Sequence, residues 1–70
     1  MRKLDFAERI RNLRSEMDLT QWQLADVLET TQRKISYWEL GKTEPDLLTL
    51  WKIADFFDVS VDYLLGRKDV

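Results

Sequence analysis

The chain has no cysteine and no histidine, and it has only two glycines and one proline among 70 residues. Disulfide bonds are therefore excluded, and the commonest side-chain ligands of metals are absent. No apolar run approaches the roughly 18 residues of a membrane-spanning helix. The basic N-terminus lacks the apolar segment of a secretory signal. We therefore expect a cytoplasmic protein that uses no metal, and we expect no membrane partner.

Charge is unevenly distributed, although the formal net charge is only −2. Residues 1–14 hold five basic residues and two acidic ones, whereas residues 45–66 hold one basic residue and four acidic ones. A net negative charge is unfavourable for a protein that binds nucleic acid. A field with one positive end can still steer a chain toward phosphate groups.

Apolar residues recur at helical spacing and β-branched alternation is missing, so the sequence predicts an all-α fold. We expect one domain over residues 1–66 and a short, loose C-terminal tail over 67–70. Five short helices are predicted from their N-caps, which are Asp5 (with Glu8 in a capping box), Thr20 (with Gln23), Thr31, Asp46 and Ser60. The first three helices are expected to end near Asp18, before Glu29 and near Leu40, with Gly41 as a C′ residue. The inward positions are expected to be Phe6, Ile10, Leu13, Met17, Leu24, Ala25, Val27, Leu28, Leu47, Leu50, Trp51, Ile53, Ala54, Phe57, Val61, Leu64 and Leu65.

The helix predicted over residues 32–40 carries an acid among its apolar positions. At about 100° per residue, Ile35, Trp38 and Glu39 share one arc, which must face the core. An unpaired carboxylate there is costly. Arg14 lies on the shoulder of the first helix's apolar stripe, so we predict an Arg14–Glu39 ion pair. The alternative is that Glu39 reaches water from the helix end.

The opposite arc of this helix holds polar groups suited to nucleic-acid bases: Gln32, Arg33, Ser36 and Tyr37, together with Leu40. Glutamine can bond adenine through two hydrogen bonds, arginine can bond guanine in the same way, and serine suits several base edges. The first turns of a recognition helix meet base edges. An ordinary solvated helix face would hold the same residue types, so this face alone leaves both interpretations open.

The segment TQWQLADVLETTQRKISYWELGKTEP, residues 20–45, resembles the helix-turn-helix of the Cro and lambdoid phage repressor family, also called the xenobiotic-response-element type. The resemblance continues through residues 47–65 and reaches back to residues 11–14, so it covers nearly the whole chain. Its most specific part is the ordered set TQxxLA, ISxWExGK, LxKIA and VSVDxLL. The resemblance implies a compact five-helix, lambda-repressor-like DNA-binding domain with the helix-turn-helix at about 20–40. It also implies a transcriptional regulator, a repressor that binds a palindromic operator in double-stranded DNA as a homodimer.

The resemblance also implies roles for individual residues. Gln32, Arg33, Ser36 and Tyr37 match base-facing positions, and Arg14 and Glu39 match a structural ion pair. Gln21 matches a residue that contacts phosphate and braces the recognition helix. The full set of implied phosphate contacts is Thr20, Gln21, Thr31, Lys34, Lys42 and Thr43.

The chain departs from the family pattern at Glu29, where the family usually has glycine. Glu29 must adopt a left-handed conformation, or the turn must differ. Glu29 and Glu44 also add negative charge near the expected DNA side. These features support an alternative function: a protein-interaction module on the same fold, an antitoxin-like or antirepressor-like partner that binds DNA weakly.

Three apolar residues lie off the predicted apolar arcs in the C-terminal third: Leu48, Phe56 and Tyr63. Exposed apolar clusters mark contact sites, and the resembled family commonly dimerises through this region, so we expect the dimer surface here. The sequence offers no base to activate a nucleophile, no carboxylate cluster and no glycine-rich loop. We therefore expect neither enzymatic activity nor a cofactor, and we find no sign of a small-molecule effector.

Overall fold

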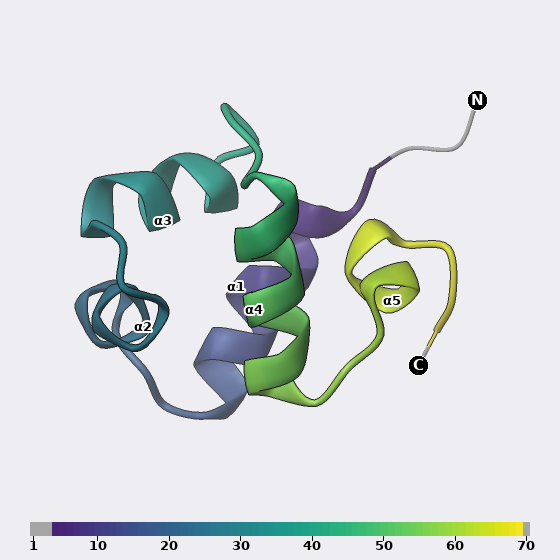
Figure 1. Cartoon of the computed structure of the whole chain (residues 1–70), viewed down its shortest axis with the longest axis horizontal. Coiled ribbons are helices and arrows are strands. Elements are labelled where there is room, and N and C mark those ends of the chain that lie inside the picture. Colours follow the sequence, from purple (N-terminus) through teal and green to yellow (C-terminus); the bar gives the residue numbers. More distant parts are fainter. Residues whose placement is uncertain (1–3, 70) are drawn as a thin grey trace.

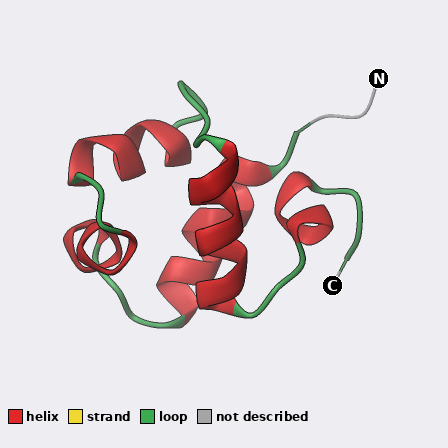
Figure 2. Cartoon of the chain, in the orientation of Figure 1, coloured by secondary structure: helices red, strands yellow, loops and turns green. Residues whose placement is uncertain are grey.

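The computed structural model describes residues 4–69, so the first two bases of the basic N-terminus and the last residue of the expected tail lie outside the described residues. The described residues form five helices: α1 (Phe6–Glu16), α2 (Gln21–Leu28), α3 (Gln32–Glu39), α4 (Leu47–Phe57) and α5 (Val61–Leu65) (Figures 1 and 2). The predicted all-α, five-helix architecture is confirmed.

Four of the five predicted N-caps are formed. In each, the cap side chain accepts a hydrogen bond from the backbone N–H three residues later, and the four are Thr20, Thr31, Asp46 and Ser60. Thr20 has the full capping box, because the Gln23 side chain also accepts from the Thr20 N–H at 2.8 Å. Each cap satisfies a backbone donor that would otherwise lack a partner, which fixes where the helix begins.

Asp5 is the N-cap residue of α1, as predicted, but the capping box expected with Glu8 is wrong. Asp5 has φ −99° and ψ 10°, and its side chain makes no cap hydrogen bond. Its carboxylate instead lies against Gly66, at the end of α5, where an added Cβ atom would come within 2.8 Å of Asp5 Oδ2. Gly66 also has φ +83°, which favours glycine. The Asp5 side chain therefore contacts Gly66 and does not cap α1.

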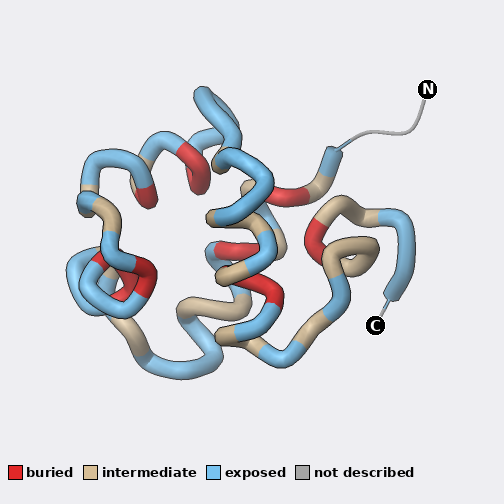
Figure 3. The backbone as a smooth tube through the Cα atoms, viewed as in Figure 1, coloured by how far each residue is buried: buried red, intermediate tan, exposed pale blue. Residues whose placement is uncertain are grey.

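The five largest fully buried side chains come one from each helix: Ile10, Leu24, Ile35, Ile53 and Leu64. They form one core with their neighbours, against which partly buried residues of the loops and of α4 and α5 also pack (Figure 3). Because every helix contributes to the same small core, no helix is an independent unit. Displacing one helix exposes apolar surface on the others.

Several positions expected to face inward are exposed instead: Met17, Val27, Leu47 and Trp51. Met17 follows the last residue of α1, and Asp18 turns the chain away with φ +56°. Val27 lies beside the arc that Leu24, Ala25 and Leu28 bury. On α4, apolar residues cover a wider arc of the helix than the part that contacts the core, so Leu47 and Trp51 remain exposed.

Helices α2 and α3 lie at one end of the molecule and α5 lies at the other (Figure 1). The molecule measures 32 × 24 × 21 Å along its principal axes. Arg9 on α1 donates to the Lys68 backbone carbonyl at 2.8 Å, and its guanidinium lies 4.3 Å from the Tyr63 ring centroid. The Arg67 N–H donates to the Asp62 carbonyl at 2.8 Å. Residues 67 and 68 are thus exposed but held by hydrogen bonds to α1 and α5.

Within residues 4–69, no helix has the length and apolar character needed to cross a membrane. The same residues contain no group of three or more acidic, histidine or cysteine side chains that could hold a metal ion.

Candidate nucleic-acid interface

The turn between α2 and α3 is built without glycine. Glu29 adopts the left-handed conformation, with φ 57° and ψ 44°, and the Thr30 N–H donates to the Ala25 carbonyl at 2.9 Å. This hydrogen bond satisfies a carbonyl group at the C-terminal end of α2, as the same bond does in helices that end at a glycine. Thr31 then caps α3 through its hydroxyl, which accepts from the Lys34 N–H at 3.2 Å. Of the two alternatives left open by the sequence at Glu29, the structure has the left-handed conformation.

Helix α3 has a buried face and an outward face. Ile35, Trp38 and Glu39 are buried, with Glu39 only 5% exposed. On the other side Arg33, Lys34 and Tyr37 are exposed, while Gln32 and Ser36 are half-buried at the boundary between the faces. The helix is thus held by its apolar side and presents polar groups outward, as the sequence predicts.

The predicted Arg14–Glu39 ion pair is confirmed. Arg14 Nε lies 2.6 Å from Glu39 Oε2, and Arg14 Nη2 donates to Glu39 Oε1 at 3.0 Å. Arg14 Nη1 also donates to the Leu19 carbonyl at 2.8 Å, so one guanidinium ties α1, the loop before α2 and α3 together. The hydrogen bond to Glu39 and the charge of Glu39 raise the pKa of Arg14, although burial acts in the opposite direction.

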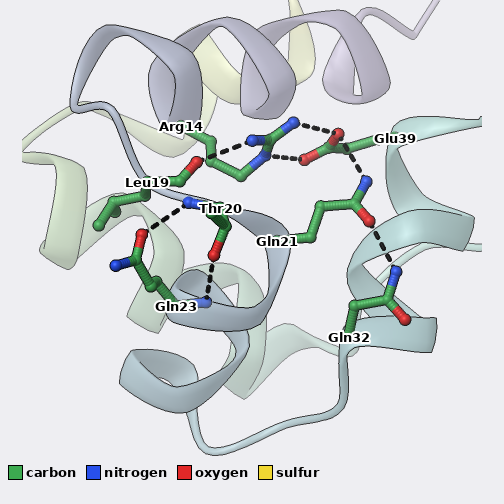
Figure 4. A network of polar contacts seen from close by, with 7 residues as sticks. All are labelled: Arg14, Leu19, Thr20, Gln21, Gln23, Gln32 and Glu39. Carbon is green, nitrogen blue, oxygen red and sulfur yellow. Dashed lines mark hydrogen bonds and ion pairs between the residues drawn. The ribbon is translucent and has the colours of Figure 1, made fainter.

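Two glutamines extend this pair to the start of α3. Gln21 Nε2 donates to Glu39 Oε1 at 3.1 Å, and Gln32 Nε2 donates to Gln21 Oε1 at 2.7 Å (Figure 4). We call the four side chains Arg14, Glu39, Gln21 and Gln32 the polar relay. The expected bracing of the recognition helix by Gln21 is confirmed by its bond to Gln32.

The sequence does not predict the polar relay. It predicts Gln32 on the arc opposite Glu39, but the two residues are seven positions apart. They therefore lie only about 20° apart around an α-helix. That spacing was the signal that could have revealed the connection. Gln32 is consequently a braced side chain, whereas Arg33 and Tyr37 are exposed.

The remaining candidate phosphate contacts lie at helix starts or in the loop after α3. Thr20 and Gln21 lie at the start of α2, Thr31 caps α3, and Lys42 and Thr43 are exposed in the loop before α4. The Lys42 ammonium lies 5.7 Å from the Tyr37 ring centroid, so this loop cation borders the outward face of α3.

An open groove of about 500 Å³ lies between α3 and the start of α4. Its lining includes two cations of α3, Arg33 and Lys34, and two anions beyond it, Glu44 and Asp46. Hydrogen bonds from Thr49 lower the pKa of Asp46, and the positive charge of Lys34 acts in the same direction. The outward face is therefore basic along α3 and acidic at its far edge.

The three candidate dimer residues do not form one exposed cluster. Leu48 is 62% exposed, but Phe56 packs partly buried against the core and Tyr63 lies half-buried beside Arg9. The expectation that all three are exposed together is wrong, because the core and α1 cover Phe56 and Tyr63. The strongly exposed apolar side chains of this region are on the first turns of α4: Leu47, Leu48 and Trp51.

Comparison with known proteins gives consistent matches. The helix-turn-helix family model matches residues 10–64. The HTH-type transcriptional activator BcrR of Enterococcus faecalis is 39% identical over 67 residues, which are 96% of this chain and 33% of BcrR. A transcriptional regulator from Listeria innocua superposes with a TM-score of 0.88 at 34% identity, covering 93% of this chain and 61% of the other. The P22 c2 repressor, solved with a synthetic operator, gives a TM-score of 0.84 at 32% identity. The match covers 90% of this chain and 96% of the repressor chain.

The chain spans between a third and just over half the length of the curated relatives it matches, from 33% of BcrR to 57% of YobD of Bacillus subtilis. The match nevertheless includes all the elements described above, from α1 to α5. Since the family model covers the ion pair, the turn and α3 alike, the chain belongs to the helix-turn-helix family, in the branch of the Cro and lambdoid phage repressors.

Proposed function

We propose that this chain is a sequence-specific transcriptional regulator that binds double-stranded DNA, and that it acts as a repressor by occupying an operator. The observation that carries the proposal is α3. Its buried face is fixed by Ile35, Trp38 and an ion-paired Glu39, while its other face presents hydrogen-bonding groups outward. A rigid helix with such a face can enter the major groove.

Base recognition is assigned to the outward face of α3, through Gln32, Arg33, Ser36 and Tyr37. Amide, guanidinium and hydroxyl groups are those that distinguish base edges in the major groove. Phosphate contacts would come from Thr20, Gln21, Thr31, Lys34, Lys42 and Thr43, and these contacts would set the register on the duplex. We assign no enzymatic activity and no cofactor to the chain.

A homodimer is part of the proposal, since a palindromic operator offers two equal half-sites about 34 Å apart. The exposed side chains of Leu47, Leu48 and Trp51 give α4 an apolar surface that a second copy would cover. The P22 c2 repressor, which is similar over nearly its whole length, was solved with an operator. We expect the protein to act in the cytoplasm, on the nucleoid.

A second candidate function is a protein-interaction module that binds DNA weakly. The net charge of −2 and the exposed acids Glu29 and Glu44 support it, as does the exposed apolar surface on α4. The two functions respond differently to salt. Phosphate-driven binding weakens steeply as ionic strength rises, whereas an apolar protein interface does not.

Selection of bound duplexes from a random DNA pool, at near-physiological salt, tests the proposal. The parent should enrich a palindromic site, and the Gln32→Ala/Arg33→Ala variant should lose it. Arg11→Ala removes the same charge from an exposed position on α1 and serves as the matched control. Absence of any enriched site would reject the DNA-binding proposal in favour of the interaction module.

Single substitutions separate the two kinds of contact. Gln32→Ala should relax preference at one base position and cost about 1–3 kcal/mol of binding free energy. Lys42→Ala should weaken binding to every sequence alike and lower the slope of log affinity against log salt by about one. A changed preferred site after Lys42→Ala would contradict the phosphate role of Lys42.

A further inference from the structure

The polar relay has a direction, and Glu39 sets it. A carboxylate can only accept hydrogen bonds, so Gln21 must turn its NH₂ group toward Glu39 Oε1, at 3.1 Å. The Gln21 Oε1 atom then faces Gln32 and must receive a donor. Gln32 therefore presents its own NH₂ group to Gln21, at 2.7 Å. Each amide orientation follows from the one before it.

The consequence appears at the outer end of the relay. One N–H of Gln32 is used by Gln21, which leaves one N–H and the Oε1 atom available for a ligand. Among the described residues Gln32 Oε1 meets no donor, and it points away from Gln21 (Figure 4). Gln32 thus offers one donor beside one acceptor.

That pattern distinguishes the two purines. In the major groove, adenine presents an acceptor, N7, beside a donor, N6, which complements a glutamine oriented this way. Guanine presents two acceptors, N7 and O6, so its O6 atom would face the Gln32 oxygen. Reversing the amide of Gln32 would place two N–H groups outward and reverse this preference.

We propose that Glu39, although buried, is a positioning residue that fixes which purine Gln32 recognises. It acts through Gln21, by holding both amides of the polar relay in one direction. This inference rests on the proposed function, since it concerns the base contacts of α3.

The substitution Glu39→Gln should reverse the relay. Arg14 has only donors, and its shortest contact is Nε to Glu39 Oε2 at 2.6 Å, so the oxygen of the new amide stays there. The new NH₂ group then takes the place of Oε1, facing Gln21, and the longer bond from Arg14 Nη2 to that position, at 3.0 Å, is lost. Gln21 must offer its oxygen to that NH₂ group and its own NH₂ to Gln32, which leaves the NH₂ of Gln32 outward.

The experiment uses the full chain and two duplexes that differ only at the position whose preference Gln32→Ala removes. One duplex carries adenine there and the other guanine. The parent should bind the adenine duplex roughly tenfold more tightly, and Glu39→Gln should bring the adenine-to-guanine affinity ratio below one. Gln21→Met keeps the ion pair but cuts the relay, so its ratio should move toward one even if its overall affinity falls. Glu16→Gln makes the same exchange at an exposed position of α1 and should leave the ratio unchanged.

A second readout needs no DNA. In the parent, one proton of the Gln32 side-chain NH₂ is bonded to Gln21, so hydrogen exchange at that group, followed by NMR, should be slowed. In Glu39→Gln both protons face solvent, and exchange should be severalfold faster. Gln21→Met frees the same group and tests the relay even if Glu39→Gln does not fold.

The outcomes separate the inference from the proposed function. If the parent selects no duplex, the proposed function fails, and the exchange rates alone decide the direction of the relay. If the parent selects guanine at the Gln32 position, the inference is overturned while DNA binding stands. An unchanged ratio in both folded Glu39→Gln and Gln21→Met would overturn it as well.

Discussion

Replacing Arg14 by methionine would remove the cation from a carboxylate that has almost no access to water. The Glu39 side chain is 3% exposed and the Arg14 side chain 17%, and Arg14 donates to both carboxylate oxygens. Removing one partner of such a pair typically costs about 3–5 kcal/mol. The Leu19 carbonyl also loses its donor, which adds about 1 kcal/mol. We expect Arg14→Met to lower the free energy of unfolding by about 4–6 kcal/mol.

A domain of this size has a total stability of about 4–10 kcal/mol, so the variant should lie near or beyond the point of unfolding at 25 °C. Urea denaturation followed by tryptophan fluorescence measures the loss, because Trp38 is buried in the core. Arg11→Met is the matched control on the same helix, and at its exposed position it should change stability by about 0.5 kcal/mol or less.

The double variant Arg14→Met/Glu39→Leu tests the reason for the loss. It removes the unpaired charge together with its partner, and apolar replacement of a buried pair is often close to neutral. We expect it to recover more than half of the stability lost in Arg14→Met. A loss below about 1 kcal/mol in the single variant, or no recovery in the double variant, would refute the argument that burial makes the pair obligatory.

Four further substitutions test the backbone and the caps. Glu29→Gly should raise the free energy of unfolding by about 0.5–1 kcal/mol, since it relieves a left-handed residue at φ 57°, as thermal melting can show. Gly41→Ala should lower the free energy of unfolding by about 1 kcal/mol, through its φ of +74° alone. Gly66→Ala should lower it by at least about 1 kcal/mol more, because the added Cβ would meet Asp5. Equal losses would contradict the tight α1–α5 contact. The folded-state pKa of Asp46 lies below its ordinary value of 3.8. Its contribution to stability is therefore complete above pH 3.8 and is lost as the pH falls through the lower folded-state pKa. Asp46→Asn should therefore flatten the decline of the melting temperature between about pH 5 and about pH 2.

Local rules predicted most of the fold correctly because local interactions decide those features. The four formed N-caps each depend on a side chain and a backbone donor three residues apart, and both are visible in the sequence. The Arg14–Glu39 pair was predictable as well, because a buried acid requires a partner and few cations lie near the core. The left-handed turn at Glu29 followed from the family pattern.

Most of the failures involve contacts between different helices. Asp5 has the right spacing for a capping box, but Gly66 of another element determines where its carboxylate lies. On α4, helical periodicity predicted the wide apolar surface but not its limits. The core reaches Ile53 and Ala54, whereas Leu47 and Trp51 remain uncovered. The seven-residue spacing of Gln32 and Glu39 indicates that both lie on one side of α3. The bridging position of Gln21 also required the relative placement of α2 and α3.

The position of α5 has a consequence for how this domain can be combined with others. Helix α5 lies at the end of the molecule opposite α2 and α3 (Figure 1). A polypeptide attached after α5 would therefore begin on the side away from the outward face of α3. The fold is thus suited to modular use, in which one unit can be joined to quite different neighbours while its binding face stays open.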